Sequence, residues 1–263
     1  MHRPGRRNAG VRLRRAGPFV ESERHCVPRG ISPDAPRQID RVIFLVTAGP
    51  TREPIDPVRY ISNRSSGKMG YAIAEAALKA GHDVVLISGP VKLHSSRGAK
   101  LVSVSTSDEM FDAVHQHAGD CDVCVLCAAV ADYKPATVSP LKIKKRGDEI
   151  SLELVPTRDI LASLGSRRDR RFLLVGFAAE THDLQENAVK KLRAKNCDIM
   201  VANDARVGME SDENELLVLF RGGEIKKFHR TPKQILAREL IKIFSKFATK
   251  VFDKKNVMIS ERN

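Results

Sequence analysis

Short apolar runs alternate with amphipathic helical stretches along most of the chain. Runs of β-forming apolar residues, which are typical of buried strands, lie at 42–47, 82–88, 100–105, 121–132, 171–178 and 198–204. Helices are predicted between them, from Gly67 to Gly81, after Thr106 and over 183–196. Strands and helices that alternate at this pitch form right-handed βαβ units. We therefore predict an α/β fold, a Rossmann-like and mostly parallel sheet with helices on both faces.

The helical stretches carry boundary signals. Gly81 is typical of a helix C-terminus, and Thr106 with Glu109 forms a capping-box signature. Thr231 is predicted to cap the last helix, with Pro232 in its first turn. The inward-facing positions are predicted to be Met69, Ile73, Ala76, Ala77 and Ala80 in the first helix, and Ile235, Leu236, Leu240, Ile243, Phe244 and Phe247 in the last.

Three segments interrupt this alternation. Residues 48–66 form a polar, Pro-bearing connection that is predicted to lack regular structure, and long connections of this kind are usually functional. Residues 141–155 read as two alternating runs around a polar turn, which predicts a β-hairpin flap that protrudes from the sheet. Residues 215–230 predict a second hairpin, around Gly222 and Gly223.

Composition divides the chain into a folded part and two flanks. Residues 1–40 hold nine arginines, no lysine and four acidic residues without hydrophobic periodicity. They predict a disordered basic extension, with an organellar transit peptide as the alternative. The folded domain is expected over 41–250, followed by a C-terminal tail over 251–263.

The charge and cysteine content narrow the class of protein. The formal net charge of +13 suits nucleic acid, but also a small substrate that carries phosphates. Aromatic residues make up 5% of the chain and none is Trp, so surfaces that stack on nucleic-acid bases are hard to assemble.

The longest apolar run, 123–131, is shorter than the ~18 residues of a membrane span. An odd number of cysteines predicts a reducing, cytoplasmic setting, and those at 121–127 fit a buried strand better than a metal site.

The segment SSGKMG at 65–70 is the first candidate for chemistry. Ser66 and Gly67 lead directly into a helix, where backbone N–H groups and the helix dipole can bind an anion, and Arg64 and Lys68 add charge. A serine cap and a tight glycine turn would explain the same residues without a ligand. Neither the P-loop pattern nor the G-x-G-x-x-G fingerprint is present.

Other candidates are an acid after the fourth strand and two lysine pairs. Asp132 follows small residues that let a ligand approach the backbone. Lys142 and Lys144 would share one face of a strand, and Lys191 and Lys195 lie one helical turn apart. A surface turn and solvated charged faces are the alternatives. Backbone sites that suit a phosphate, together with lysines and no obvious acid–base residue, favour a function in nucleotidyl or phosphoryl transfer.

The chain contains, in this order, the segments TAGPTREPIDPVRYISNRSSGKMG, CAAVADYKP, KIKK, GFAAET and KNCDIMVAND. As an ordered set they closely resemble the bacterial phosphopantothenate–cysteine ligase family over about 46–246. The resemblance implies a homodimeric, Rossmann-like ligase of coenzyme A biosynthesis. Such an enzyme joins 4′-phosphopantothenate to L-cysteine through an acyl-cytidylate and converts CTP to CMP and pyrophosphate with Mg²⁺. The KxKK pattern favours CTP over ATP.

The family's functional residues match individual positions of this sequence. Asn63 matches the residue that engages the acyl-cytidylate, and Arg59 one that contacts phosphopantothenate. Ala128 and Ala129 match a backbone contact to the substrate, and Lys142 the first lysine of the closing flap. The cytidine nucleotide contacts match Asp132, Pro156, Thr157, Arg158, Asp159, Phe177, Lys191 and Lys195. No metal ligand is assigned.

The flavin-dependent decarboxylase half that accompanies many members is absent from this sequence. The chain is therefore expected to be a free-standing ligase, with a separate phosphopantothenoylcysteine decarboxylase as partner, or a fragment of a larger product. Two other classes remain open. A nicotinamide-dependent dehydrogenase would share the sheet but lacks its glycine fingerprint here, and a nucleic-acid-binding module would use the basic excess.

Overall fold

The computed structural model describes residues 41–145, 147, 149–208 and 211–260. The predicted basic extension over 1–40 and the last residues of the predicted tail, 261–263, lie outside the described residues. Within the predicted tail, residues 251–260 continue the last helix, α6 (Lys233–Ser260).

One large sheet organises the described residues. Its strands are β1 (Ile43–Ala48), β4 (Asp83–Ser88), β5 (Lys100–Ser103), β6 (Val123–Leu126), β9 (Leu173–Glu180), β10 (Ile199–Asp204), β11 (Glu213–Phe220) and β12 (Ile225–Pro232). Within the described part of the chain these eight strands pair in the order β12-β11-β10-β9-β6-β1-β4-β5. The strands from β10 to β5 are parallel, whereas β11 and β12 are antiparallel additions. The predicted mostly parallel sheet is confirmed.

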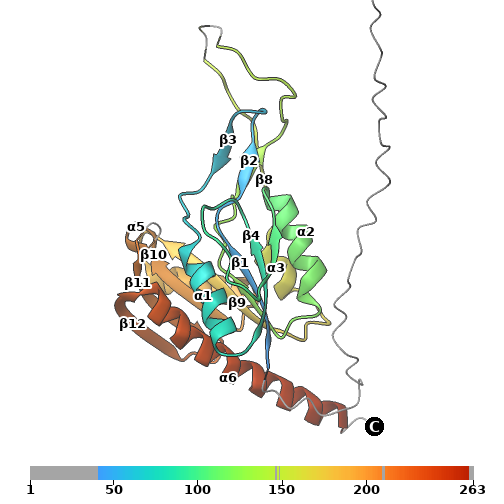
Figure 1. Ribbon diagram of the computed structural model, residues 1–263, viewed down its shortest axis with the longest axis vertical. Helices are drawn as coiled ribbons and strands as arrows, with labels where there is room; N and C mark the ends of the chain where they lie inside the picture. The colour runs from blue at the N-terminus through green and yellow to red at the C-terminus, as the bar shows by residue number, and fades with distance from the viewer. Residues whose placement is uncertain (1–40, 146, 148, 209–210, 261–263) are drawn as a thin grey trace, which may run out of the picture. The chain divides into compact units, whose positions relative to one another are not determined.

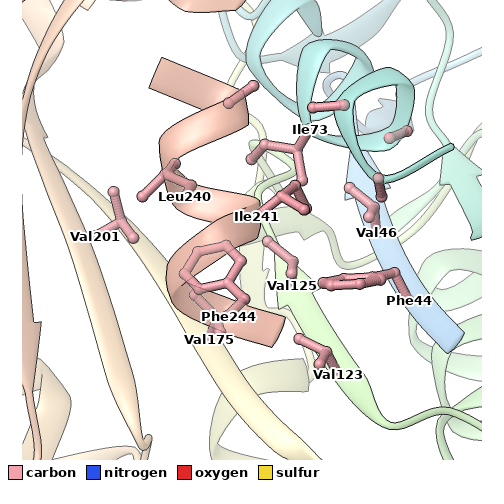
Figure 2. Close-up of a cluster of buried hydrophobic side chains, with 14 of the residues drawn as sticks. Phe44, Val46, Ile73, Val123, Val125, Val175, Val201, Leu240, Ile241 and Phe244 are labelled. Atoms are coloured by element: carbon pink, nitrogen blue, oxygen red, sulfur yellow. The ribbon is translucent and has the colours of Figure 1, made fainter. Parts of the chain in front are cut away.

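Helices cover both faces of the sheet because successive strand residues point in opposite directions. In β1, Phe44 and Val46 face α1 (Lys68–Lys79) and α6. Leu45 lies between them in sequence and faces α2 (Ser107–Ala118), α3 (Ile160–Gly165) and α4 (Leu184–Ala194). Figure 2 shows the first core, where Ile73 of α1 lies near Val46 and where Leu240 and Phe244 of α6 belong to the same cluster as Phe44. A short helix, α5 (Ala205–Gly208), follows β10.

Most of the predicted boundary signals are confirmed. The side chains of Thr106 and Glu109 form the capping box of α2, and Gly81 takes a left-handed φ of 86° after α1. Thr231 is different, because β12 continues to Pro232 and the Thr231 hydroxyl donates to the His229 carbonyl rather than capping α6. Two predicted inward positions, Ala80 and Ile235, are exposed, since each lies at a helix end beyond the buried stripe.

The connection over 48–66 has more structure than the sequence predicts. It contains a small antiparallel hairpin of β2 (Arg52–Pro54) and β3 (Tyr60–Ser62). The buried Asp56 carboxylate closes the turn by accepting the backbone N–H groups of Val58 and Arg59 at 2.8 Å each. A local side-chain-to-backbone turn of this kind needs no hydrophobic pattern, which is why periodicity missed it.

The predicted flap hairpin over 141–155 is wrong in its strands. The antiparallel pair is instead β7 (Tyr133–Pro135) with β8 (Leu154–Pro156), and the described residues of 141–153 carry no strand. Lys142 and Lys144 therefore do not share a strand face. The apolar positions of the segment, such as Leu141 at 76% exposure and Ile150 at 56%, have no sheet to pack on. Figure 1 shows this green-to-yellow segment extending beyond β2 and β3.

Candidate active site

A cavity of about 570 Å³ opens at the carboxyl ends of the parallel strands, where open α/β sheets bind ligands. Four segments build its walls. They are the loop from Asn63 into α1, the segment from Leu126 to Asp132 after β6, the turn from Thr157 into α3, and residues of β9 and β10 with their neighbours. The last wall includes Phe177, Ala179, Asn203, Asn214 and Lys233.

The loop before α1 needs glycine for steric reasons. Gly67 is the residue before the helix and has a φ of 75°, a backbone angle that residues with a side chain rarely adopt. A Cβ on Gly70 would lie 2.6 Å from the Cβ of Ala48, so the helix start packs directly on the end of β1. The Ser65 hydroxyl accepts the Gly67 N–H at 3.3 Å. The first turn of α1 thus presents backbone N–H groups to the cavity beside Lys68, an arrangement that suits a phosphate.

Hydroxyl and amide side chains fix the segment after β6. Thr47 Oγ1 accepts the N–H groups of Cys127 and Ala128 at 3.0 Å each. Asn63 Nδ2 donates to the carbonyl oxygens of Ala129 and Val130 at 3.1 Å each. The bonds from Asn63 tie the glycine loop to the small-residue segment, so they join two walls of the cavity.

The turn before α3 is held to the same segment from the other side. Thr157 donates its hydroxyl to the Ala131 carbonyl at 2.6 Å and its N–H to the Asp132 carbonyl at 2.9 Å. Asp159 caps α3 by accepting the Ala162 N–H at 2.8 Å and also accepts from Lys195. Burial alone would raise the pKa of Asp159, but these hydrogen bonds outweigh it and lower the pKa.

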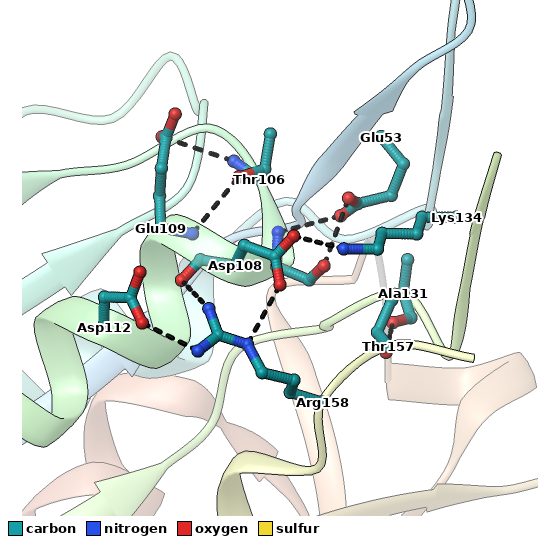
Figure 3. A network of polar contacts seen from close by, with 10 residues as sticks. Glu53, Thr106, Asp108, Glu109, Asp112, Ala131, Lys134, Thr157 and Arg158 are labelled. Atoms are coloured by element: carbon teal, nitrogen blue, oxygen red, sulfur yellow. Dashed lines mark hydrogen bonds and ion pairs between the residues drawn. The ribbon is translucent and has the colours of Figure 1, made fainter. Parts of the chain in front are cut away.

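A charge network on α2 anchors this turn (Figure 3). The Asp108 carboxylate accepts from Lys134 of β7 and from Arg158 Nε at 3.0 Å. Arg158 also pairs with Asp112 at 2.9 Å, and its guanidinium lies 4.0 Å from the centre of the Phe111 ring. The hydrogen bond from Lys134, followed by that from Arg158, lowers the pKa of Asp108. Both ends of the segment between β7 and β8 are thereby fastened to one carboxylate.

Arg59 belongs to a second cluster, outside the cavity, which also includes the backbone of Ile143. Asp56 accepts Arg59 Nε at 3.1 Å and the N–H of Ile143 at 3.1 Å, and Arg59 Nη2 donates to the Ile143 carbonyl at 2.9 Å. The hydrogen bond from Arg59 is the main cause of a strongly lowered Asp56 pKa. Asp56 thus joins the β2–β3 turn to Ile143. The side chain of the preceding residue, Lys142, is exposed.

Comparisons with known proteins place this geometry in a family. The DNA/pantothenate metabolism flavoprotein C-terminal domain matches residues 40–247. The chain belongs to this family. Coenzyme A biosynthesis bifunctional protein CoaBC of Escherichia coli (strain K12) is 46% identical over 204 residues, which cover 75% of this chain and 50% of that protein. The same-named protein of Vibrio vulnificus (strain CMCP6) is 44% identical over 212 residues, covering 79% and 53%. The chain spans about half the length of these relatives.

Solved structures agree with the family assignment. The C-terminal domain of Coenzyme A biosynthesis bifunctional protein CoaBC has a TM-score of 0.69 and 42% identity, and covers 80% of this chain and 96% of its own. A Cab2 mutant in complex with phosphopantothenate-cysteine has the same TM-score at 17% identity, covering 82% and 89%. That second likeness shows the fold alone.

In this member of the family, the cavity brings together most of the predicted site residues. Those that line it are Asn63, Ser66, Gly67, Ala128, Ala129, Asp132, Thr157, Arg158, Asp159 and Phe177. Arg59, Lys142, Pro156, Lys191 and Lys195 do not line it. Lys195 contacts the lining residue Asp159, and Lys191 pairs with Glu180 of β9 at 2.6 Å.

Sequence reasoning missed several polar residues of this family member's cavity. Thr47, Asn203, Asn214 and Lys233 all line it and are less than a tenth exposed. Asn203 could have been found, because it lies in the polar end of the apolar run over 198–204. Lys233 follows the second hairpin and carries no local signal.

Three further properties of the described residues concern metal binding, the state of the cysteines and membrane insertion. There, His, Cys, Asp and Glu side chains form no group of three that could hold a metal ion. The described cysteines are free thiols. The buried-strand prediction for residues 121–127 is confirmed for Cys124 in β6, whereas Cys121 is buried but precedes the strand and Cys127 follows it and is half-buried. None of the helices that were described is long and apolar enough to cross a membrane.

Proposed function

We propose that this chain is a phosphopantothenate–cysteine ligase of coenzyme A biosynthesis. It joins 4′-phosphopantothenate to L-cysteine and converts CTP to CMP and pyrophosphate. The observation that carries the proposal is the single cavity in which Asn63, the glycine loop, Asp132 and the turn over 157–159 meet. The names of the relatives, which are bifunctional coenzyme A biosynthesis proteins, support the same pathway.

The proposed reaction has two steps. A carboxylate oxygen of 4′-phosphopantothenate attacks the α-phosphorus of CTP, the bond to the bridging oxygen breaks, and pyrophosphate leaves. The cysteine amine then attacks the acyl carbon of the acyl-cytidylate, loses a proton, and releases CMP. Both reactants of the first step are anions, so positive charge and oriented N–H donors are what the protein has to supply.

The cavity offers those donors at defined places. The α1 N-terminus and Lys68 suit a phosphate, while Phe177 and the turn over 157–159 suit the cytidine. Asn63 has an amide that is already oriented by its two backbone acceptors, so its oxygen points away from them toward a polar substrate group. Lys142 acts when its segment closes over the cavity and excludes water from the acyl-cytidylate.

Mg²⁺ is part of this proposal and fits the residues present. The carboxylates that line the cavity are Asp132 and Asp159. Mg²⁺ in nucleotide sites usually takes one or two carboxylates and completes its shell with phosphates and water. Asp132, which is exposed, would hold the ion, and the ion would neutralise phosphate charge.

We further propose a homodimer that acts in the cytoplasm, without nucleic acid or membrane partners. Large apolar side chains are exposed on the β2–β3 hairpin and the segment beyond it, including Val58, Tyr60, Leu141, Ile150 and Leu152. Exposed apolar patches often mark interfaces. The odd number of cysteines fits a reducing compartment. The product would be consumed by a phosphopantothenoylcysteine decarboxylase, on a separate chain or elsewhere in a larger one.

A pyrophosphate-release assay tests the proposal. The protein is mixed with 4′-phosphopantothenate, L-cysteine and Mg²⁺, and each of the four nucleoside triphosphates is added in turn. We expect release with CTP that depends on phosphopantothenate, and amide product only when cysteine is present. Equal rates with ATP would overturn the CTP assignment, and no release with any nucleotide would overturn the ligase.

A further inference from the structure

A buried lysine forms part of the cavity wall without any role assigned so far. Lys233 is the first residue of α6, lines the cavity, and is only 2% exposed. Its Nζ donates to the Ser211 carbonyl at 2.6 Å, and its backbone N–H donates to the Asp212 carbonyl at 2.9 Å. Burying an ammonium group is costly unless negative charge or acceptors compensate for the lost water. Because Lys233 lies in the cavity wall, an anion bound in the cavity would add to the compensation that the Ser211 carbonyl provides.

A second lysine and an aspartate lie near Lys233. Lys68, the first residue of α1, lines the same cavity and pairs at 2.6 Å with Asp212, whose side chain is 80% exposed. Burial and then the positive charge of Lys68 lower the pKa of Lys233, so the two ammonium groups are close enough to repel. Cys127, which follows β6, lines the same cavity as Lys233 and Lys68.

These cations flank the glycine loop. The α1 N-terminus at Gly67 adds a partial positive charge and N–H donors on the same side of the cavity. The lining carboxylates, Asp132 and Asp159, belong instead to the segment after β6 and the turn before α3. Two lysines and the backbone donors of the glycine loop thus line the same cavity, and a doubly charged phosphate bound to them would relieve the repulsion between Lys68 and Lys233.

We propose that Lys233 is a phosphate-binding residue that holds, together with Lys68 and the loop of Ser65 to Gly67, a phosphate group of a substrate. This proposal rests on the proposed ligase function for the identity of the ligand. The phosphate belongs either to the nucleotide, and then to the pyrophosphate product, or to 4′-phosphopantothenate. Lys233 acts through its positive charge, which its hydrogen bond to the Ser211 carbonyl leaves in place.

Calorimetric titration of the full chain separates these sources. Pyrophosphate, CTP and 4′-phosphopantothenate are titrated separately into the wild type, Lys233→Met, Lys233→Gln and Lys233→Arg. Lys233→Gln keeps a donor for the Ser211 carbonyl while removing the charge. Lys227→Met is the matched control, because Lys227 on β12 is an exposed lysine paired with Glu215 at 3.1 Å and lies outside the cavity.

We expect both neutral variants to bind the phosphate ligand about 10- to 100-fold more weakly, the loss typical of one charge-assisted hydrogen bond. Lys233→Arg should retain most of the affinity, and Lys227→Met all of it. Weaker binding of pyrophosphate and CTP assigns the nucleotide phosphates, whereas weaker binding of 4′-phosphopantothenate alone assigns the other source. Thermal unfolding shows whether each variant is folded. If Lys233→Met is not folded, the ligand affinities of Lys233→Gln test the proposal.

Wild-type affinity in a folded Lys233→Gln variant would overturn the proposal, as would a wild type that binds none of the three ligands. These outcomes are distinct from failure of the ligase proposal. If the binding losses occur but no nucleotide supports pyrophosphate release, the phosphate site stands and the ligase assignment falls. If turnover occurs and the variants bind normally, the ligase stands and Lys233 has a structural role.

Discussion

The side-chain amide of Asn63 donates a hydrogen bond of 3.1 Å to the carbonyl oxygen of Ala129. The two residues belong to the loop before α1 and the segment after β6, so this bond joins two walls of the cavity. It orients the amide before any ligand arrives, because a second bond from the same nitrogen reaches the Val130 carbonyl. Asn63 is thereby pre-organised for a substrate group that needs a hydrogen-bond acceptor.

Replacing Asn63 by Ala should separate the two proposed half-reactions. We expect some CTP-dependent activation of phosphopantothenate to remain and amide formation to fall by a larger factor, because the acyl-cytidylate loses its oriented contact. Since the side chain is exposed, the free energy of unfolding should fall by about 1 kcal/mol or less. Mass spectrometry of quenched reactions can compare acyl-cytidylate with final product. An equal fall in both steps with unchanged stability would make Asn63 a general binding residue.

The Lys142→Gln variant should impair the first half-reaction. Removing one charge-assisted contact to the triphosphate should cost on the order of 2 to 4 kcal/mol in the transition state. Lys142 is exposed and lies outside the cavity, so this effect requires its segment to close. Pyrophosphate release is the measurement, and Lys190→Gln, an exposed lysine paired with Glu186, controls for general charge. Unchanged release would leave Lys142 as a solvated lysine.

Asp108→Asn should weaken nucleotide binding without contacting the nucleotide. The carboxylate holds Lys134 and Arg158, which flank the segment between β7 and β8, so its loss should loosen the turn over 157–159. We expect the KM for CTP to rise roughly 2- to 10-fold with a smaller change in kcat, since partly exposed ion pairs contribute ~1 kcal/mol or less each. Asp169→Asn, which removes an exposed pair with Arg167, is the control. The same KM change in both variants would contradict the positioning role.

Cysteines with a raised pKa should be poor nucleophiles in the native protein. Burial raises the pKa of Cys121, Cys127 and Cys197 to about 12, so almost no thiolate is present near neutral pH. We expect iodoacetamide to label these residues slowly in the folded protein and quickly after unfolding in urea. Mass spectrometry of each peptide gives the rates. Rapid labelling of native Cys127 would show that the cavity end of β6 opens to solvent.

Local physical signals in the sequence determined much of the fold. The apolar run over 42–47 gives rise to β1 because each residue from Val42 to Val46 packs into one of the two cores between the sheet and its helices. Thr106 and Glu109 cap α2 through contacts three residues apart, which any chain with that spacing can form. Gly67 likewise indicated a backbone conformation that residues with a side chain rarely adopt. Such features depend on neighbours in the chain, so they can be read without the fold.

Tertiary structure alone decided the rest, because the deciding contacts join distant residues. The alternating pattern over 141–155 predicted two paired strands, but the described residues of 141–153 carry no strand, and Asp56 fastens the segment by accepting the Ile143 N–H. Lys233 carries no motif, and it becomes a cavity residue only because α6 packs against α1 and brings its first turn beside Lys68. Asp108 joins Lys134 and Arg158 across segments that the sequence keeps apart. Electrostatic and hydrogen-bond partners of this kind are set by the fold, not by spacing along the chain.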